Sequence, residues 1–366
     1  MEELTEGVRA LAVTPPDSSS AGDNGTEGFT SEDGTQGDLT DIFARNPEDV
    51  AISLNEHLRW SRFRCRRDPF ISWTTSMAFA IHYAMYKSKE ERLGLEEIML
   101  CVIDTTRYPP GTFMQDLVLL RIFENSVCGH RAITVYGSKT TWNEKGLGDF
   151  LDLRTKRKRR GVYYFGEYLS QGRTCVTQSC SNTVHMDKII NADVFKIAPQ
   201  LQAELESTAK GRFERSRCAE AVLELREDFR KQYDPSTHLN GEQRDAGYRI
   251  ACQFSGSFTF AILVNLLSLR PFWADRTIGT AILECDPDRV REFCLQPTRV
   301  VADDTVPEVQ QFQMNILSIH EACYKDAMKT MWWLSRLEDL ADKVVRDAGE
   351  LKRKLEEIRH VTGDSV

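Results

Sequence analysis

The pattern of hydrophobic and polar positions divides the chain into two halves of different character. In the first half, short apolar or β-branched runs recur between polar segments, and they predict strands at residues 8–13, 70–75, 98–103, 133–136 and 162–165. Apolar residues at helical spacing predict helices over 42–60 and 77–86. Because strands and short helices alternate irregularly, the pattern favours an α+β domain over a regular βαβ array.

A polar segment separates the first predicted strand from the first predicted helix. Residues 14–41 are rich in Gly, Ser, Thr and Asp, and their only apolar members are Ala21, Phe29 and Leu39. Such a composition cannot bury a core, so we expect a long mobile loop here.

Helical periodicity dominates the chain after Pro199. Apolar residues fall at helical spacing over 201–229, and a further helix is expected over 243–269. We therefore expect two domains, an α+β domain over 1–195 and an all-α domain over 196–366.

The last segment carries the most regular pattern of the sequence. Two heptad positions are apolar in four consecutive heptads, the first with Leu334, Ala341, Ala348 and Leu355, and the second with Leu337, Val344, Leu351 and Ile358. This predicts a long helix at about 330–360 with a narrow hydrophobic stripe. The stripe either packs back on its own domain or forms a coiled coil with a second copy or another protein.

Charge is unevenly distributed along the 366 residues, whose net charge is −8. Residues 1–50 hold twelve acidic residues and two arginines, so the remainder carries a net charge of +2. The start of the chain is acidic, and no apolar segment reaches the roughly 20 residues that span a bilayer, so we expect neither a secretory signal nor a membrane partner.

Ten scattered cysteines without a CxxC pair favour a reducing intracellular location, cytoplasmic or nuclear.

Three polar residues in separate segments form a candidate site. Arg9 lies on the first predicted strand, Ser72 lies within the stretch PFISWTTS, and Glu167 lies at the end of a predicted strand within YFGEYLSQG. In this order and local context, they resemble the Arg–Ser–Glu pattern of the ADP-ribosyltransferase fold. The segments also resemble an uncharacterised family, common in fungi, that carries related PFIS and EYL stretches. The resemblance spans roughly residues 7–190.

This resemblance implies an ADP-ribosyltransferase fold with NAD as the cofactor and no metal. In the family's reaction the bond from ribose to nicotinamide breaks with oxocarbenium-like character, so Glu167 would stabilise the positive charge and hold a ribose hydroxyl. Arg9 would grip the diphosphate. Ser72 would hold the glutamate in its working orientation, and Thr74 in the same motif is a further cofactor-binding candidate.

Aromatic residues complete the implied cofactor site. Phe79 and Tyr83 lie one helical turn apart on the helix that follows the serine motif. The resemblance makes them candidates to stack on the nicotinamide ring.

Two positions depart from the family pattern. The serine motif is commonly Ser-Thr-Ser, whereas this chain has Ser72-Trp73-Thr74, which fits if Trp73 faces the core on the opposite side of the strand. Arginine-modifying members carry Gln or Glu two residues before the catalytic glutamate, where this chain has Phe165. The pattern therefore does not favour arginine modification. It leaves NAD glycohydrolase activity, transfer to another acceptor, or an inactive fold that acts as an interaction module, and each of the three residues also has a purely structural interpretation.

A basic run precedes Glu167 by a few residues. Six of seven consecutive residues are basic: Arg154, Lys156, Arg157, Lys158, Arg159 and Arg160. Such a block is typical of a nuclear-import signal or of a contact with an acidic protein or a nucleic acid, and equally of a solvated loop.

Other chemistries lack their sequence signatures. The chain has no HExxH, no P-loop GxxxxGKS, no GxGxxG after a strand and no GxSxG. The most closely spaced cysteines, Cys175 and Cys180, have no paired histidines nearby. We therefore expect no zinc hydrolase, P-loop NTPase, Rossmann dehydrogenase or α/β-hydrolase.

Overall fold

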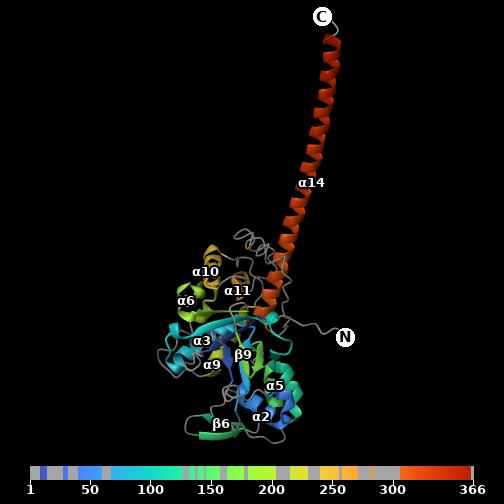
Figure 1. Ribbon diagram of the computed structural model, residues 1–366. Coiled ribbons are helices and arrows are strands. Elements are labelled where there is room, and N and C mark those ends of the chain that lie inside the picture. Colours follow the sequence, from blue (N-terminus) through green and yellow to red (C-terminus); the bar gives the residue numbers. More distant parts are fainter. Residues whose placement is uncertain are drawn as a thin grey trace, which may run out of the picture. The chain divides into compact units, whose positions relative to one another are not determined.

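The chain divides into two compact units, one of Met1–Asp275 with Gln296–Ile316 and the other of Arg276–Leu295 with Leu317–Val366 (Figure 1). Residue 195, where the domain boundary was expected, falls inside the first unit. The computed structural model describes residues 9–14, 28–31, 40–59, 67–126, 132–136, 139–143, 146–156, 163–176, 180–202, 215–229, 240–254, 258–270, 282 and 306–363.

A six-stranded sheet forms the centre of the first unit, and its neighbouring strands run antiparallel. The strands, in spatial order, are β10 (Ser181–His185), β4 (Met99–Asp104), β1 (Arg9–Thr14), β3 (Phe70–Thr74), β8 (Glu167–Gln171) and β5 (Met114–Gln115). The strands predicted at 8–13, 70–75 and 98–103 are thus confirmed as β1, β3 and β4.

Two further sheets have two strands each. One pairs β6 (Ala132–Tyr136) with β7 (Lys139–Asn143), and β6 confirms the strand predicted at 133–136. The other pairs β2 (Gly28–Thr30) with β9 (Arg173–Cys175). The prediction of a continuous loop over 14–41 is therefore wrong at β2, because the Phe29 ring packs edge-on against Trp73 at 5.2 Å and holds this segment on the sheet. Residues 15–27 and 32–39 lie outside the described part of the chain.

Helices make up the remaining regular structure. They are α2 (Pro47–Leu58), α3 (Met77–Glu91), α4 (Asp116–Phe123), α5 (Leu147–Thr155), α6 (Met186–Asn191), α7 (Val194–Ile197), α9 (Arg215–Asp228), α10 (Gly241–Ala251), α11 (Phe258–Leu267) and α14 (Pro307–Gly363), with short 3-10 turns η1 (Ile42–Ala44), η2 (Leu95–Glu97), η3 (Thr105–Arg107) and η4 (Glu124–Ser126). The described chain is mixed α and β up to β10 and helical after it, as the hydrophobic pattern predicted.

Capping residues fix where the helices beside the sheet begin. The Asn46 side chain caps α2, and the Ser76 hydroxyl caps α3 two residues after β3 ends. The helices predicted over 42–60 and 77–86 are confirmed, the first of them as η1 followed by α2.

The strand predicted at 162–165 is wrong. Residues Tyr163–Gly166 form no strand, and β8 begins at Glu167. Gly166 has a φ of +65°, in the left-handed region, and a Cβ placed there would lie 2.0 Å from Oγ1 of Thr75. The turn at Gly166, which only glycine fits, separates residues 163–165 from β8. Glu167 is therefore the first residue of the strand.

The single helix predicted over 243–269 is also wrong. Two helices, α10 and α11, occupy this segment, and the residues between them include Ser255-Gly256-Ser257, which have poor helix propensity. The Thr259 hydroxyl donates a hydrogen bond to the Phe254 carbonyl at 2.8 Å, which ties the start of α11 to the end of the preceding turn.

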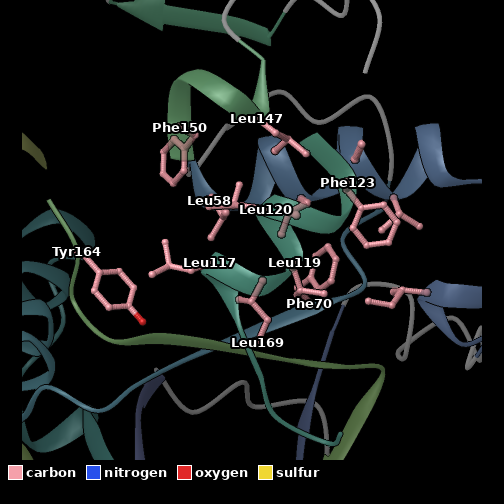
Figure 2. Packing of buried hydrophobic residues seen from close by; sticks show 14 of the residues in the cluster. Leu58, Phe70, Leu117, Leu119, Leu120, Phe123, Leu147, Phe150, Tyr164 and Leu169 are labelled. Carbon is pink, nitrogen blue, oxygen red and sulfur yellow. The ribbon is translucent and has the colours of Figure 1, made fainter. Parts of the chain in front are cut away.

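Two hydrophobic clusters cover the two faces of the sheet at β3. On one face, Phe70 and Leu169 pack with residues of α2, α4, α5 and the segment before β8: Leu58, Leu117, Leu119, Leu120, Phe123, Leu147, Phe150 and Tyr164 (Figure 2). Trp73 belongs to the cluster on the other face, with Ile71 and Tyr168. Since successive strand residues point to opposite faces, Trp73 and Ser72 lie on opposite sides of β3, as the Ser72-Trp73-Thr74 motif requires.

Helix α14 spans 57 residues and contains the helix predicted at about 330–360. Its first turns belong to the first unit, where Val309, Phe312 and Ile316 are buried. In the second unit, the apolar seam is 55–62% exposed at Leu334, Leu337, Val344, Leu351 and Leu355. The side chain of Ile358 lies outside the described residues. Among the helices described, none combines the length and the apolar character needed to cross a membrane.

Candidate functional site

The strands that carry Arg9, Ser72 and Glu167 are neighbours in the sheet, in the order β1, β3, β8. Leu11 is opposite Thr74, and Thr74 is opposite Glu167, so this row of positions shares one face. Because β1 and β3 are antiparallel, Arg9 and Ser72 each lie two residues from that row but in opposite directions along the strands. Their strand positions belong to the same face. The side chain of Arg9 itself lies outside the described residues.

Glu167 is buried and bound by an arginine. Nη2 of Arg154, at the end of α5, donates to Oε2 of Glu167, and its Nε lies 3.5 Å from Oδ2 of Asp116, at the start of α4. Each of the three side chains is at most 6% exposed. Burial alone would lower the pKa of Arg154, but the carboxylates of Glu167 and Asp116 outweigh this effect and raise it. One guanidinium thus compensates two buried carboxylates.

This pairing corrects the interpretation of the basic run at 154–160. The prediction that Arg154 is available to an acidic partner is wrong, because its charge is buried and compensated inside the protein. Lys156 is exposed and pairs with Asp152 at 2.6 Å. The remaining members, Arg157, Lys158, Arg159 and Arg160, lie outside the described residues.

Ser72 binds a histidine instead of the glutamate. Its Oγ lies 2.7 Å from Nε2 of His57, in the last turn of α2. Nδ1 of His57 lies 2.6 Å from Oδ2 of Asp68, just before β3. The resemblance gives Ser72 the role of holding Glu167, whereas in the structure Arg154 holds that carboxylate.

Neither His57 nor Asp68 was among the site residues predicted from the sequence. A usable signal exists for the histidine, because Val50, Leu54 and His57 follow the i, i+4, i+7 spacing of one helix face, and His57 is buried with the other two. A histidine in an otherwise apolar stripe requires a polar partner on the surface that the stripe covers. Which partner it finds depends on β3 lying beneath α2.

Phe79 and Tyr83 lie together in an aromatic stack. Their ring centroids are 5.9 Å apart with an interplanar angle of 16°. Phe79 also stacks on Phe165 at 4.6 Å and 11°, and the Arg226 guanidinium lies 5.2 Å from the Phe165 centroid. Phe165, the residue that departs from the family pattern, therefore has a packing role between α3 and α9.

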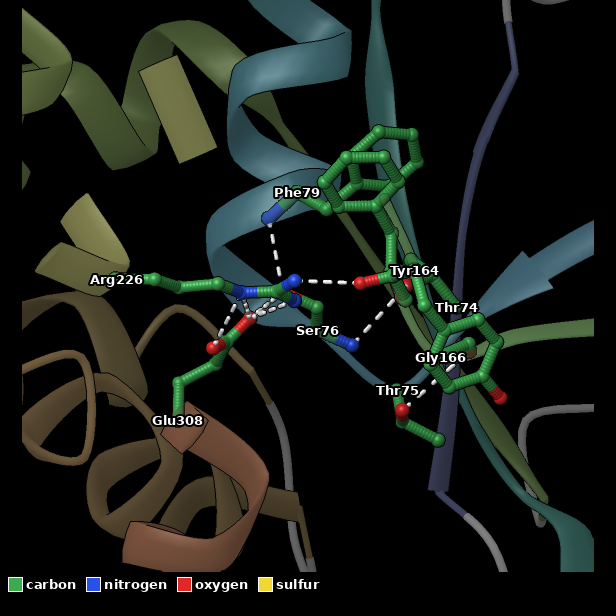
Figure 3. Close-up of polar contacts among 9 residues, drawn as sticks. Thr74, Thr75, Ser76, Phe79, Tyr164, Gly166, Arg226 and Glu308 are labelled. Atoms are coloured by element: carbon green, nitrogen blue, oxygen red, sulfur yellow. Dashed lines mark hydrogen bonds and ion pairs between the residues drawn. The ribbon is translucent and has the colours of Figure 1, made fainter. Parts of the chain in front are cut away.

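A polar network joins Thr74 to the start of α14 (Figure 3). The Thr74 hydroxyl donates to the Phe165 carbonyl at 2.5 Å and accepts from the Ser76 N–H at 3.0 Å. The Ser76 hydroxyl donates to Oε1 of Glu308, and Arg226 binds the same carboxylate through Nε at 2.9 Å and Nη2 at 2.7 Å. The segment before Glu167 is thus fixed to β3 and α14.

Cysteines and acidic residues form no metal centre in the part of the chain that the structure describes. The described cysteines are free thiols at Cys101, Cys175, Cys180, Cys252 and Cys323. Tyr108 lies beside two of them: its hydroxyl donates to the Cys175 carbonyl at 3.1 Å and lies 3.2 Å from Sγ of Cys180. Burial and the contact with that thiol raise the pKa of Tyr108, so the hydroxyl keeps its proton.

Comparison with known proteins identifies one matching family model, described as Domain of unknown function (DUF7587), over residues 16–144. No curated protein and no solved structure matches the chain. The match is consistent with an uncharacterised family. It includes His57, Asp68 and Ser72 but ends before Glu167.

Proposed function

We propose that the chain is an ADP-ribosyltransferase-like protein that binds NAD and cleaves its bond between nicotinamide and ribose. One observation carries this proposal: β1, β3 and β8 are adjacent, and the register puts the strand positions of Arg9, Ser72 and Glu167 on one face. The Arg–Ser–Glu pattern requires this arrangement of three segments that are distant in the sequence.

The donor set on this face suits NAD in its chemistry. When bound, NAD supplies a glycosidic bond whose cleavage has oxocarbenium-like character. The carboxylate of Glu167 stabilises that positive charge and accepts a hydrogen bond from a ribose hydroxyl. Arg9 has the charge and fork geometry to hold the diphosphate, and the hydroxyls of Ser72 and Thr74 lie along the same strand face.

Glu167 already has a cationic partner, and this sets a condition on the reaction. Among the described residues, Arg154 binds Oε2 of Glu167, which leaves Oε1 as the oxygen for a ribose hydroxyl. The guanidinium fixes the carboxylate in a dry site, where its charge acts more strongly on a developing positive charge than it would in water.

Calorimetric titration of the full chain with NAD, together with an assay of nicotinamide release, tests the proposal. Glu167→Gln keeps the shape of the side chain and removes its charge, so we expect nicotinamide release to fall about a hundredfold or more. Glu96→Gln, at an exposed position on η2, is the matched control and should retain activity. A folded wild-type chain that neither binds NAD nor releases nicotinamide would contradict the proposal.

Interaction through α14 is the second candidate function, with the same fold acting without catalysis. The exposed apolar seam of α14 favours it, since a soluble helix seldom leaves such a stripe in water. A second copy of the chain is the expected partner, because each seam offers the matching apolar surface. Self-association that survives Glu167→Gln but is lost on substituting the seam would support this function and separate it from the first.

An intracellular location, cytoplasmic or nuclear, forms part of the proposal. The free described cysteines fit a reducing compartment, and Lys156 is the described exposed residue of the basic run. Alanine substitution of residues 156–160, with Arg154 retained because it is buried, should abolish nuclear accumulation of a fluorescent fusion. Unchanged distribution would remove the import role of the run.

A further inference from the structure

Three side chains on the α2 face of the sheet form a continuous hydrogen-bonded chain. Asp68 Oδ2 lies 2.6 Å from Nδ1 of His57, and Nε2 of the same ring lies 2.7 Å from Oγ of Ser72. They come from the segment before β3, the last turn of α2 and the middle of β3. We propose that Ser72 is a nucleophile for acyl transfer to water, activated by His57 and oriented by Asp68. This activity goes beyond the proposed NAD chemistry and does not depend on it.

The carboxylate of Asp68 determines which ring nitrogen of His57 carries the proton. An ionised carboxylate can only accept, so Asp68 requires the proton of a neutral His57 ring to sit on Nδ1. Nε2 then presents a lone pair, and the Ser72 hydroxyl donates to it. Oδ1 of Asp68 accepts the Phe70 N–H at 3.0 Å, which holds the carboxylate in place. A nucleophile, a base and a group that orients the base are thus within hydrogen-bond distance in the required order.

Packing restricts the histidine ring to this orientation. The Phe70 ring meets the imidazole edge-on, with centroids 5.6 Å apart and planes at 60°. The side chains of His57 and Asp68 are only 10% and 4% exposed, whereas Ser72 is partly exposed. The base is therefore shielded from water, and the nucleophile is the member of the chain that a substrate can reach.

Strand geometry supplies a backbone donor beside the nucleophile. The Thr75 N–H donates to Gly166, on the β8 side of β3, and the backbone groups of alternate residues point to opposite neighbours. The Ser72 N–H therefore points toward β1. Among the described residues, β1 and β3 pair only at Leu11 and Thr74, so this ladder has ended before it reaches Ser72. That N–H is suited to stabilise the oxyanion of a carbonyl attacked by the adjacent Oγ.

The reaction balances with water as the only co-reactant. Oγ of Ser72 attacks the carbonyl carbon of an ester, and its proton passes to Nε2 of His57. The bond from the carbonyl carbon to the alcohol oxygen breaks, and that oxygen leaves with the proton from Nε2. Water then attacks the acyl-serine, gives a proton to Nε2, and the carboxylic acid departs as the proton returns to Oγ.

Apolar neighbours indicate the class of substrate. Leu169 lies directly opposite Ser72 in the ladder, and Phe70 lies two residues away on the same face. Both side chains are buried in the cluster beneath α2 and α4, so the nearest strand neighbours of the nucleophile on this face are apolar. Esters with an uncharged acyl group fit this setting.

Covalent labelling of the full chain tests the proposal without NAD. A biotin-linked fluorophosphonate reacts with activated serines, and peptide mass spectrometry should locate the label on Ser72. We expect the labelling rate and the hydrolysis of p-nitrophenyl acetate to fall about a hundredfold or more in His57→Gln and Asp68→Asn. Ser72→Ala should give no label at this position.

Controls distinguish chemistry from folding. Asp68→Asn preserves the shape of the side chain but favours the other tautomer of the His57 ring. It therefore tests the hydrogen-bonded chain from Asp68 to Ser72 even if urea denaturation shows that His57→Gln is unstable. His185→Gln removes an exposed histidine on β10, and Ser72 in this variant should be labelled at the wild-type rate. Absence of label on Ser72 in the folded wild type, or equal labelling in Asp68→Asn, would overturn the proposal. A labelled Ser72 in a chain that does not bind NAD would refute only the NAD function.

Discussion

The guanidinium of Arg154 and the carboxylate of Glu167 form a buried ion pair, and Asp116 extends it on the other side of the arginine. Replacing Arg154 with Met leaves two carboxylates in a dry site without a compensating charge. We expect Arg154→Met to lower the free energy of unfolding by about 3–5 kcal/mol. Urea denaturation followed by circular dichroism measures this loss.

A double variant checks that the loss arises from the pair. Arg154→Met with Glu167→Gln removes the charge of both partners, so it should recover part of the stability lost in the single variant. Lys156→Met is the matched control on an exposed lysine of the same segment and should change stability by less than about 0.5 kcal/mol. Strictly additive losses in the double variant would show that the two groups do not interact.

Gly166 offers a second test, because it sets the turn into β8. We expect Gly166→Ala to cost about 1–2 kcal/mol for the left-handed backbone alone, and more for the contact with the Thr75 hydroxyl. Gly148→Ala, in α5 with nothing within 4 Å of the added Cβ, should instead be neutral or stabilising by up to about 1 kcal/mol. Thermal denaturation of the two variants gives the comparison, and equal midpoints would contradict the assigned strain.

His82 on α3 predicts a pH dependence of stability. The pKa of His82 is lowered from 6.5 to about 4. Burial of the imidazole is the larger cause, and the positive charge of Lys89 is the smaller one. Between these values the unfolded chain binds a proton that the folded chain does not, so stability falls as the pH drops from 6.5 toward 4. The contribution is at most about 3 kcal/mol.

Urea midpoints at pH 7 and pH 4.5 measure the effect of His82. The variant His82→Gln cannot take up this proton, so its stability should fall less than that of the wild type over this range. His185→Gln, at an exposed position on β10, should follow the wild-type curve. A His82→Gln curve parallel to the wild type would mean that this imidazole does not titrate differently on unfolding.

The exposed seam of α14 predicts self-association of the full chain. Val344→Asp and Leu351→Asp place charges on the apolar stripe and should convert a dimer into a monomer in sedimentation equilibrium. Both side chains are exposed, so the unfolding of the first unit should not change. Ser335→Asp adds the same charge at an exposed position away from the seam and should leave the dimer intact. A monomeric wild type at high concentration would reject the second copy as partner.

Local periodicity was sufficient to predict the strands β1, β3 and β4 and the terminal helix. The runs that form these strands are mainly apolar, most clearly in β4, and the heptads of α14 extend over several turns. Turns account for the two errors. Gly166 sets a turn after which β8 begins at Glu167, and α10 ends at Ala251, well before α11 begins at Phe258.

The candidate site was predictable in its strands but not in its contacts. Arg9, Ser72 and Glu167 were expected on strands, and they lie on the neighbouring strands β1, β3 and β8, but Glu167 begins its strand where the sequence pattern had put it at the end of one. The partners of Glu167 and Ser72 come from α5 and α2, and no sequence spacing connects Arg154 or His57 to them. Those contacts arise only when helices are packed on a sheet, a step that local pattern does not specify.

Glu308 has a consequence for how the chain can be shortened. Its carboxylate lies in the first turn of α14 and is fixed by Arg226 and Ser76 inside the first unit. A stop codon upstream of this turn would leave the buried guanidinium of Arg226 without its carboxylate partner, which costs about 3–5 kcal/mol of stability in the first unit. Removal of the helix after Ile316 would spare it, so an interaction map made with deletions is interpretable only if the cut falls beyond that residue.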